Sequence, residues 1–88
     1  MYNKDNKNNK NITLKDLPVG KSCSIVSVSD EITAKKRLEE LGFEKGAYVD
    51  KLNTGFSGSP IACRVCGAVI AIRANDSKRI FVYAKNSD

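Results

Sequence analysis

The sequence predicts a mainly β protein, a small barrel of about five short strands with one inserted α-helix. Short β-rich runs are separated by turn residues over most of the chain. One segment instead carries apolar residues at helical spacing. The 88 residues fit a single domain. Because five short strands cannot form two large sheets in a chain of this size, we expect them to curl on one another.

The two ends of the chain are polar, and this sets the expected domain boundaries. Residues 1–12 include five asparagines and three lysines, with little apolar surface to bury. We expect a disordered polar tail over residues 1–12, the folded domain over residues 13–84 and a polar carboxy-terminal tail over residues 85–88. At the start of the domain, Thr13 and Asp16 resemble a capping box for a short turn that buries Leu14 and Leu17.

The helix is predicted before a glycine. Ala34, Leu38 and Leu41 recur at i, i+4 and i+7, which predicts one buried stripe. Gly42 can adopt the left-handed conformation that ends a helix, and Phe43 would then fold back on the last turn.

Five runs of residues are expected to form strands. Ile25 and Val28 in the first run lie an odd number of residues apart, so burying both requires a bulge or a bend. Cys66-Gly67 suits a tight hairpin turn, because glycine accommodates positive φ at the second central position. The expected strands are Cys23–Val28, Tyr48–Leu52, Ile61–Val65, Val69–Arg73 and Ile80–Val82.

An ordered series of motifs covers most of the chain. After Leu14-x-x-Leu17-Pro18-x-Gly20 come the helix and its glycine stop, Arg37 to Gly46, followed by Gly55-Phe56-Ser57-Gly58-Ser59-Pro60, Gly67-Ala68-Val69-Ile70-Ala71-Ile72-Arg73 and Asp76-Ser77-x-x-Ile80-x-Val82. In this order and spacing the motifs resemble the ferrous iron transport protein A (FeoA) family, over Leu14 to Val82. The chain departs from the family pattern at Ser59, at Asp76-Ser77 and in its cysteines.

The resemblance implies an SH3-like fold and a function. Proteins of this family act beside a membrane ferrous iron permease, ferrous iron transport protein B, whose cytosolic portion includes a nucleotide-hydrolysing domain. We therefore expect a non-enzymatic accessory or regulatory binding module of bacterial ferrous iron uptake. Its expected partner is the cytosolic part of the permease.

Cys63-Arg64-Val65-Cys66 is the most conspicuous chemical motif. Residues three apart in a strand point to opposite faces, whereas metal knuckles place both sulfurs on one side. Only Cys23 remains as a further thiol, and the chain has no histidine. We therefore expect no metal site and no cofactor.

Catalysis is also disfavoured. Without histidine the commonest proton shuttle near neutral pH is missing. The acidic pairs Asp30-Glu31 and Glu39-Glu40 suit the start and the wet side of a helix. The glycine-containing segment 55–60 lacks the Lys-Ser/Thr ending of a phosphate loop. We expect no catalytic residues and no enzymatic activity.

Three residues are candidates for partner binding. Phe56 is a large apolar ring among glycines and serines, so it could anchor a partner or could cap one end of the barrel. Arg64 and Arg73 are expected on neighbouring strands of the hairpin, where they could face an acidic partner or simply be solvated.

Composition limits the other partners. The net charge of +5 comes from basic and acidic residues that are mixed along the chain, so we expect no nucleic-acid binding. No apolar run approaches the roughly 20 residues needed to span a bilayer, so we expect no membrane insertion and a cytoplasmic location. The oligomeric state stays open. The alternative function is that of a partner or relative of iron-dependent or manganese-dependent transcriptional regulators, or, less favoured, a small nucleic-acid-binding barrel.

Overall fold

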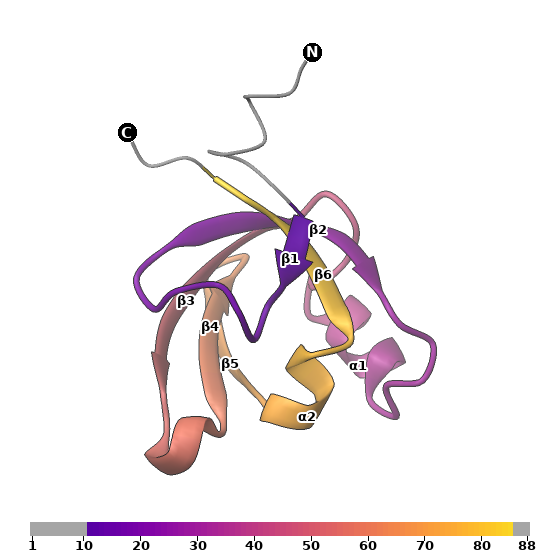
Figure 1. Cartoon of the computed structure of the whole chain (residues 1–88). Coiled ribbons are helices and arrows are strands. Elements are labelled where there is room, and N and C mark those ends of the chain that lie inside the picture. Colours follow the sequence, from indigo (N-terminus) through magenta and orange to yellow (C-terminus); the bar gives the residue numbers. More distant parts are fainter. Residues whose placement is uncertain (1–10, 86–88) are drawn as a thin grey trace.

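The computed structural model describes residues 11–85, and within them six strands form one antiparallel sheet (Figure 1). The expected disordered tail over residues 1–12 and the expected polar tail over residues 85–88 lie mainly outside the described residues. The elements are β1 (Asn11–Thr13), β2 (Ser22–Val28), α1 (Lys35–Glu40), β3 (Tyr48–Thr54), the 3-10 turn η2 (Phe56–Gly58), β4 (Ile61–Val65), β5 (Ala68–Ile72), α2 (Ala74–Ser77) and β6 (Ile80–Ala84).

The strand order is β1-β6-β2-β3-β4-β5. The structure contains a strand and an α-helix that the sequence did not predict, β1 and α2. Asn11 and Ile12 had been assigned to the polar tail, but they pair with Tyr83 and Val82 of β6. Ile12 joins the sheet because its side chain packs against the core. A second helix, α2, follows β5.

The expected closed barrel is not formed by strand pairing. Within residues 11–85, β1 and β5 are the two edges of the sheet, and each pairs with a single neighbour. The strands nevertheless bend around a common interior (Figure 1). The edge of β5 lies beside α1, because residues of these two elements line one groove.

The bulge predicted in β2 is confirmed. The register against β6 shifts between Ile25 and Ser27, so Val26 is the extra residue. This shift lets Ile25 stay in the core while Val28 packs against it. The core itself is apolar and continuous, and its fully buried members include Leu14, Leu17, Cys23, Ile32, Phe43, Val49, Ile61, Cys63, Val65, Ile80 and Val82.

One charged side chain lies inside this core. Lys51 on β3 is only 4% exposed. Its Nζ donates hydrogen bonds to the carbonyl oxygens of Leu14, Lys15 and Leu17 at 3.1, 3.0 and 2.6 Å. An ammonium has three donors, so the three carbonyls satisfy it fully. Burial lowers the pKa of Lys51 below its usual value.

The predicted glycine stop of α1 is also confirmed. Gly42 has φ of +101°. Its N–H donates to the Glu39 carbonyl at 3.0 Å, and the Phe43 N–H donates to the Leu38 carbonyl at 2.9 Å. These two bonds form a Schellman motif, which places the Phe43 ring fully inside the core.

The predicted buried stripe of this helix is wrong in two of its three residues. Leu38 is buried, but Ala34 is exposed and Leu41 is 39% exposed. The helix has only six residues, from Lys35 to Glu40. Ala34 and Leu41 are therefore its flanking caps, and the helix has room to press only one apolar residue into the core.

The helix stop generates a prediction with a matched control. Gly42 and Gly46 both have positive φ, but a Cβ on Gly42 would meet Cys66 Sγ at 2.6 Å, whereas a Cβ on Gly46 would meet nothing within 4 Å. Gly46→Ala should cost about 1 to 2 kcal/mol of unfolding free energy from backbone strain alone. Gly42→Ala should cost at least about 1 kcal/mol more, since the clash adds to the strain.

Thermal melts of the two variants measure the difference, which should amount to roughly 4 to 8 °C in melting temperature. Shortening the opposing side chain with Cys66→Ala should recover part of the loss in the Gly42→Ala protein. Equal melting temperatures for Gly42→Ala and Gly46→Ala would contradict the contact between the helix stop and the hairpin turn.

Candidate functional site

Phe56 is the most exposed large apolar residue among those that the structure describes. Its side chain is 95% exposed, so it does not cap the core, and this alternative is excluded. The ring stands on η2, in the loop between β3 and β4. Exposed aromatic rings on a well-held loop are favourable anchors for a partner.

Backbone hydrogen bonds close the loop beneath the ring. The Gly55 N–H donates to the Pro60 carbonyl at 2.7 Å, and the Gly58 N–H donates to the Gly55 carbonyl at 2.9 Å. Gly55 is required because a Cβ there would meet the Ser59 carbonyl oxygen at 2.6 Å. Ser59 Oγ accepts a hydrogen bond from the Ala74 N–H at 3.1 Å, which ties the loop to α2. The loop therefore presents Phe56 on a fixed base.

The two arginines lie far apart on the same hairpin. Arg73 is exposed and directly precedes Ala74, so it borders the Phe56 loop. Arg64 is exposed on β4 opposite Val69, near the other end of the hairpin. Arg73 lies four positions after Val69, which corresponds to about 13 Å along an extended chain. Arg73 therefore directly precedes the residue that holds the Phe56 loop, whereas Arg64 lies near the other end of the hairpin.

The electrostatic attraction of Arg64 for an acidic partner is also reduced by a neighbouring carboxylate. Asp50 on β3 lies opposite Arg64 in the register, and opposite charges at such positions offset one another. The Asp50 carboxylate also accepts a hydrogen bond from the Ser22 hydroxyl at 2.6 Å.

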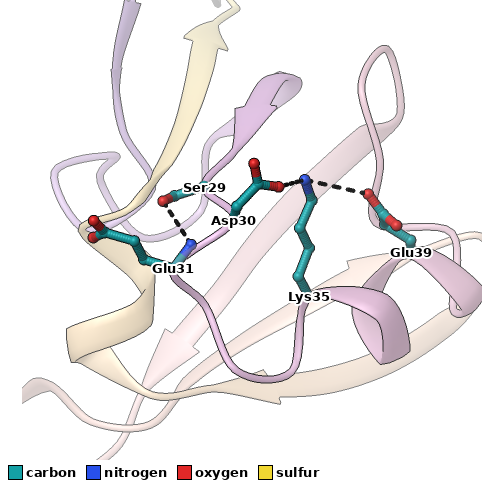
Figure 2. Close-up of polar contacts among 5 residues, drawn as sticks. All are labelled: Ser29, Asp30, Glu31, Lys35 and Glu39. Carbon is teal, nitrogen blue, oxygen red and sulfur yellow. Dashed lines mark hydrogen bonds and ion pairs between the residues drawn. The ribbon is translucent and has the colours of Figure 1, made fainter.

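The acidic residues around α1 are engaged in surface contacts. Figure 2 shows Lys35 between two carboxylates, hydrogen-bonded to Asp30 and 3.9 Å from Glu39. Ser29 Oγ accepts the Glu31 N–H at 3.0 Å, and the Glu31 carboxylate lies 3.3 Å from Arg79 Nε. The hydrogen bond from Lys35 lowers the pKa of Asp30. These contacts shape the turn that leads from β2 into α1.

The structure separates the two sulfurs of the Cys-x-x-Cys motif. Cys63 is buried and Cys66 is exposed at the hairpin turn. Burial raises the pKa of the Cys63 thiol to about 11 and that of the Cys23 thiol to about 12. Within residues 11–85 no group of three or more histidine, cysteine, aspartate or glutamate side chains is placed to hold a metal ion. The buried thiols are therefore held as neutral, apolar groups.

The sequence did not reveal a groove between α1 and β5. Its volume is about 560 Å³. The helix side contributes Ala34, Arg37, Leu38 and Leu41, and the strand side contributes Ala68, Val69, Ile70 and Ala71. The helical spacing of Ala34, Leu38 and Leu41 could have indicated the groove, but the same spacing also predicts a buried stripe.

A second missed feature is a group of aromatic side chains on the outer face of the sheet. Tyr48 is 59% exposed, and Phe81 and Tyr83 are each 44% exposed. Ser24 of β2 lies opposite both tyrosines, so the row crosses three strands. Lys85 Nζ donates to the Tyr48 hydroxyl oxygen at 2.6 Å. Alternation along β3 and β6 could have indicated this row.

The cysteines generate a prediction about thiol reactivity. At pH 8, iodoacetamide should modify Cys66 in the folded protein and should reach Cys23 and Cys63 only in denaturant, because burial keeps these two thiols protonated and inaccessible. Mass spectrometry of peptides counts the modified sites. Modification of Cys63 at the rate of Cys66 would contradict the buried placement.

The same thiols should make stability depend on pH. Their pKa values are raised in the fold from the ordinary value of 9.0, so their contribution is complete below pH 9 and is lost as pH rises toward 11 and 12. Each thiol should remove about 1.4 kcal/mol per pH unit in that window. Urea unfolding at several pH values measures the slope. Cys63→Ala should reduce this slope, whereas Cys66→Ala should leave it unchanged.

None of the helices within residues 11–85 has the length and apolar character to cross a bilayer. Comparison with curated protein sequences finds no match. Solved structures show the same fold in other proteins. The manganese-dependent transcriptional repressor superposes with a TM-score of 0.74 at 13% identity, covering 84% of this chain and 41% of the repressor. At this identity the likeness shows the fold alone.

FeoA proteins are similar in sequence as well. FeoA from Chlorobium tepidum has 28% identity and a TM-score of 0.81, with 88% of this chain and 73% of that chain covered. FeoA from Stenotrophomonas maltophilia, an SH3 domain protein solved in complex with zinc, has 30% identity and a TM-score of 0.69, with coverage of 86% and 99%. The FeoA domain model matches residues 12–84. The chain therefore belongs to the FeoA family.

Proposed function

We propose that this protein is a non-enzymatic accessory module of bacterial ferrous iron uptake that acts in the cytoplasm on the cytosolic part of the iron(II) permease, ferrous iron transport protein B. Family membership supports the process. The observation that supports a contact with the permease is the exposure of the Phe56 ring, which is 95% exposed on a closed loop.

Phe56 and Arg73 form the proposed contact, and Arg64 contributes less. A partner pocket would bury the ring, and the neighbouring guanidinium would guide an acidic surface toward it. Arg64 lies near the other end of the hairpin, with Asp50 opposite it. Its charge therefore adds only weakly to the field at Phe56.

A small domain of this kind acts on a transporter through differential binding. A module that binds one conformation of the permease more tightly shifts the population toward that conformation. This mode of action requires no catalytic group. The ion-paired carboxylates around α1 and the absence of histidine from the sequence support a binding role.

A second candidate function is binding to a metal-dependent transcriptional regulator. The supporting observation is the shared fold with a manganese-dependent repressor. An autonomous domain with this fold could occupy a surface that such regulators use for their own domain. Nucleic-acid binding by the small barrel is less favoured, because basic and acidic residues are mixed on the surface, as where Lys35 lies between Asp30 and Glu39.

The permease contact predicts a specific effect of truncating the ring. Phe56→Ala should weaken binding to the soluble cytosolic portion of the permease by roughly thirtyfold, since an aromatic anchor contributes about 2 kcal/mol or more. The melting temperature should stay the same, because the ring buries almost no area in the free protein. Isothermal titration calorimetry measures the affinity.

Tyr48→Ala is the matched control, since it removes an exposed aromatic ring from the outer face of the sheet. Its affinity for the permease portion should equal that of the wild type. Arg73→Glu should slow association, and Arg64→Glu should slow it less. Unchanged affinity of Phe56→Ala would refute the loop as the contact. Tighter binding to a metal-dependent repressor than to the permease portion would favour the second candidate.

A further inference from the structure

The outer edge of β5 pairs with no other strand in the described residues, and a groove lies between it and α1. Its residues, Ala68–Ile72, include no proline and no charge, and their register against β4 runs without a bulge. Natural proteins usually protect such edges with charges, prolines, bulges or a covering element. In the described part of the chain no strand pairs with this edge.

The hairpin turn determines which backbone groups of β5 are free. Cys66 and Gly67 both have positive φ, +52° and +80°, as in a two-residue type I′ turn. In such a hairpin the flanking pair, Val65 and Ala68, is hydrogen-bonded, and the pairs then alternate. Val69 and Ala71 therefore direct their N–H and C=O groups away from β4, toward the groove.

The wall of the groove opposite this edge is apolar. Leu38 and the 39% exposed Leu41 face it from the end of α1, and Val69 on the edge is 58% exposed. Its lining has a single charged residue, the guanidinium of Arg37, and no carboxylate. Free backbone groups, apolar walls and one cation thus lie together in one groove.

We propose that β5 binds an extended segment of another protein by strand addition, and that this segment alternates apolar residues and carries an aspartate or glutamate. Main-chain hydrogen bonds to Val69 and Ala71 would hold the strand. Apolar side chains of the segment fill the groove against Leu38 and Leu41, and its carboxylate meets Arg37.

The charge of the groove disfavours a second copy of this chain as the occupant. Pairing β5 with itself would bring two Arg37 side chains to one interface, and β5 has no carboxylate to neutralise them. The lining of the groove includes neither Phe56 nor Arg73 of the proposed permease contact. Figure 1 shows the β4–β5 turn and η2 at opposite ends of the β4–β5 hairpin.

Selection of phage-displayed random peptides on the full chain tests the proposal. Peptides of about ten residues are long enough to pair with this strand. We expect enriched peptides with alternating apolar residues and one acidic residue in fixed register. Titration of one such synthetic peptide should shift the backbone amide NMR signals of Val69 and Ala71 most. Absence of an enriched peptide class would overturn the proposal.

The backbone contact is tested at Val69. Val69→Pro removes the outward N–H but no hydrogen bond to β4, so the fold should be kept while the peptide binds at least about tenfold more weakly. Val69→Thr keeps the N–H and the branched shape and should bind as the wild type does. Should Val69→Pro fail to fold, Leu41→Asp, on an exposed position of the groove, should give the same loss of binding. Equal peptide affinity in Val69→Pro or Leu41→Asp and the wild type would overturn strand addition.

The charge is tested by a pair of neighbouring substitutions on α1. Arg37→Glu should weaken binding of the acidic peptide about tenfold, and a lysine in place of the peptide's acidic residue should restore it. Lys36→Glu, exposed on the same helix but outside the groove, should have little effect.

Two further results separate this surface from its alternatives. Phe56→Ala should bind the peptide as the wild type does, and a comparable loss in that variant would overturn the placement at β5. Failure of the permease contact would leave the peptide result unaffected. Sedimentation that showed a dimer abolished by Val69→Pro would identify a second copy as the occupant and would likewise overturn the proposal.

Discussion

The buried ammonium of Lys51 connects the start of the domain to the middle of the sheet. Burying a charge is costly unless its donors are all paired, and three carbonyl oxygens of the turn after β1 meet this requirement. The same turn inserts Leu14 and Leu17 into the core, so these contacts fix where the sheet begins. Cys63 lies opposite Lys51 in the register, and its thiol stays neutral because the surrounding core excludes water.

The β4–β5 hairpin divides the surface into two regions of different chemistry. At one end a closed loop exposes an aromatic ring, and Arg73 directly precedes the residue that holds this loop. Toward the other end, free backbone groups and an apolar groove lie beside α1. A rigid hairpin can hold two partners, or two parts of one partner, at a fixed spacing. A protein that binds one conformation of a partner more tightly stabilises that conformation, so the spacing of the two regions would determine which conformations of a partner fit both.

The same fold in a manganese-dependent repressor shows that the architecture by itself does not specify the process. In a curled sheet of short strands, stability depends mainly on the side chains that point inward. The surface positions can therefore hold many different residue types. In this chain glycines with positive φ, such as Gly42 and Gly67, build the turns of the fold. The proposed contact residue Phe56 buries almost no area in the fold. Family membership therefore supports the iron-uptake process, while the contact surface has to be argued from exposure and charge.

Local chemistry by itself determined several elements of this protein. The bulge at Val26, the left-handed stop at Gly42 and the hairpin turn at Cys66-Gly67 each follow from spacing or from φ preferences within a few residues. The split of Cys63 and Cys66 between core and surface follows from strand alternation. Arg64 and Arg73 are exposed, as their places on the hairpin strands predict, whereas the sequence left open whether Phe56 is exposed or caps the core.

Tertiary structure alone decided the rest. An apolar residue at helical spacing faces either the core or solvent depending on what packs beside the helix, so Leu41 could not be assigned from its spacing. The pairing of Asn11 and Ile12 with β6 joins residues about 70 positions apart in the sequence, which no local pattern encodes. The groove and the separation of Arg64 from Arg73 arise from strand order and register. These are long-range properties, and the physical reason is that burial and edge exposure belong to the assembled sheet and not to any single segment of the chain.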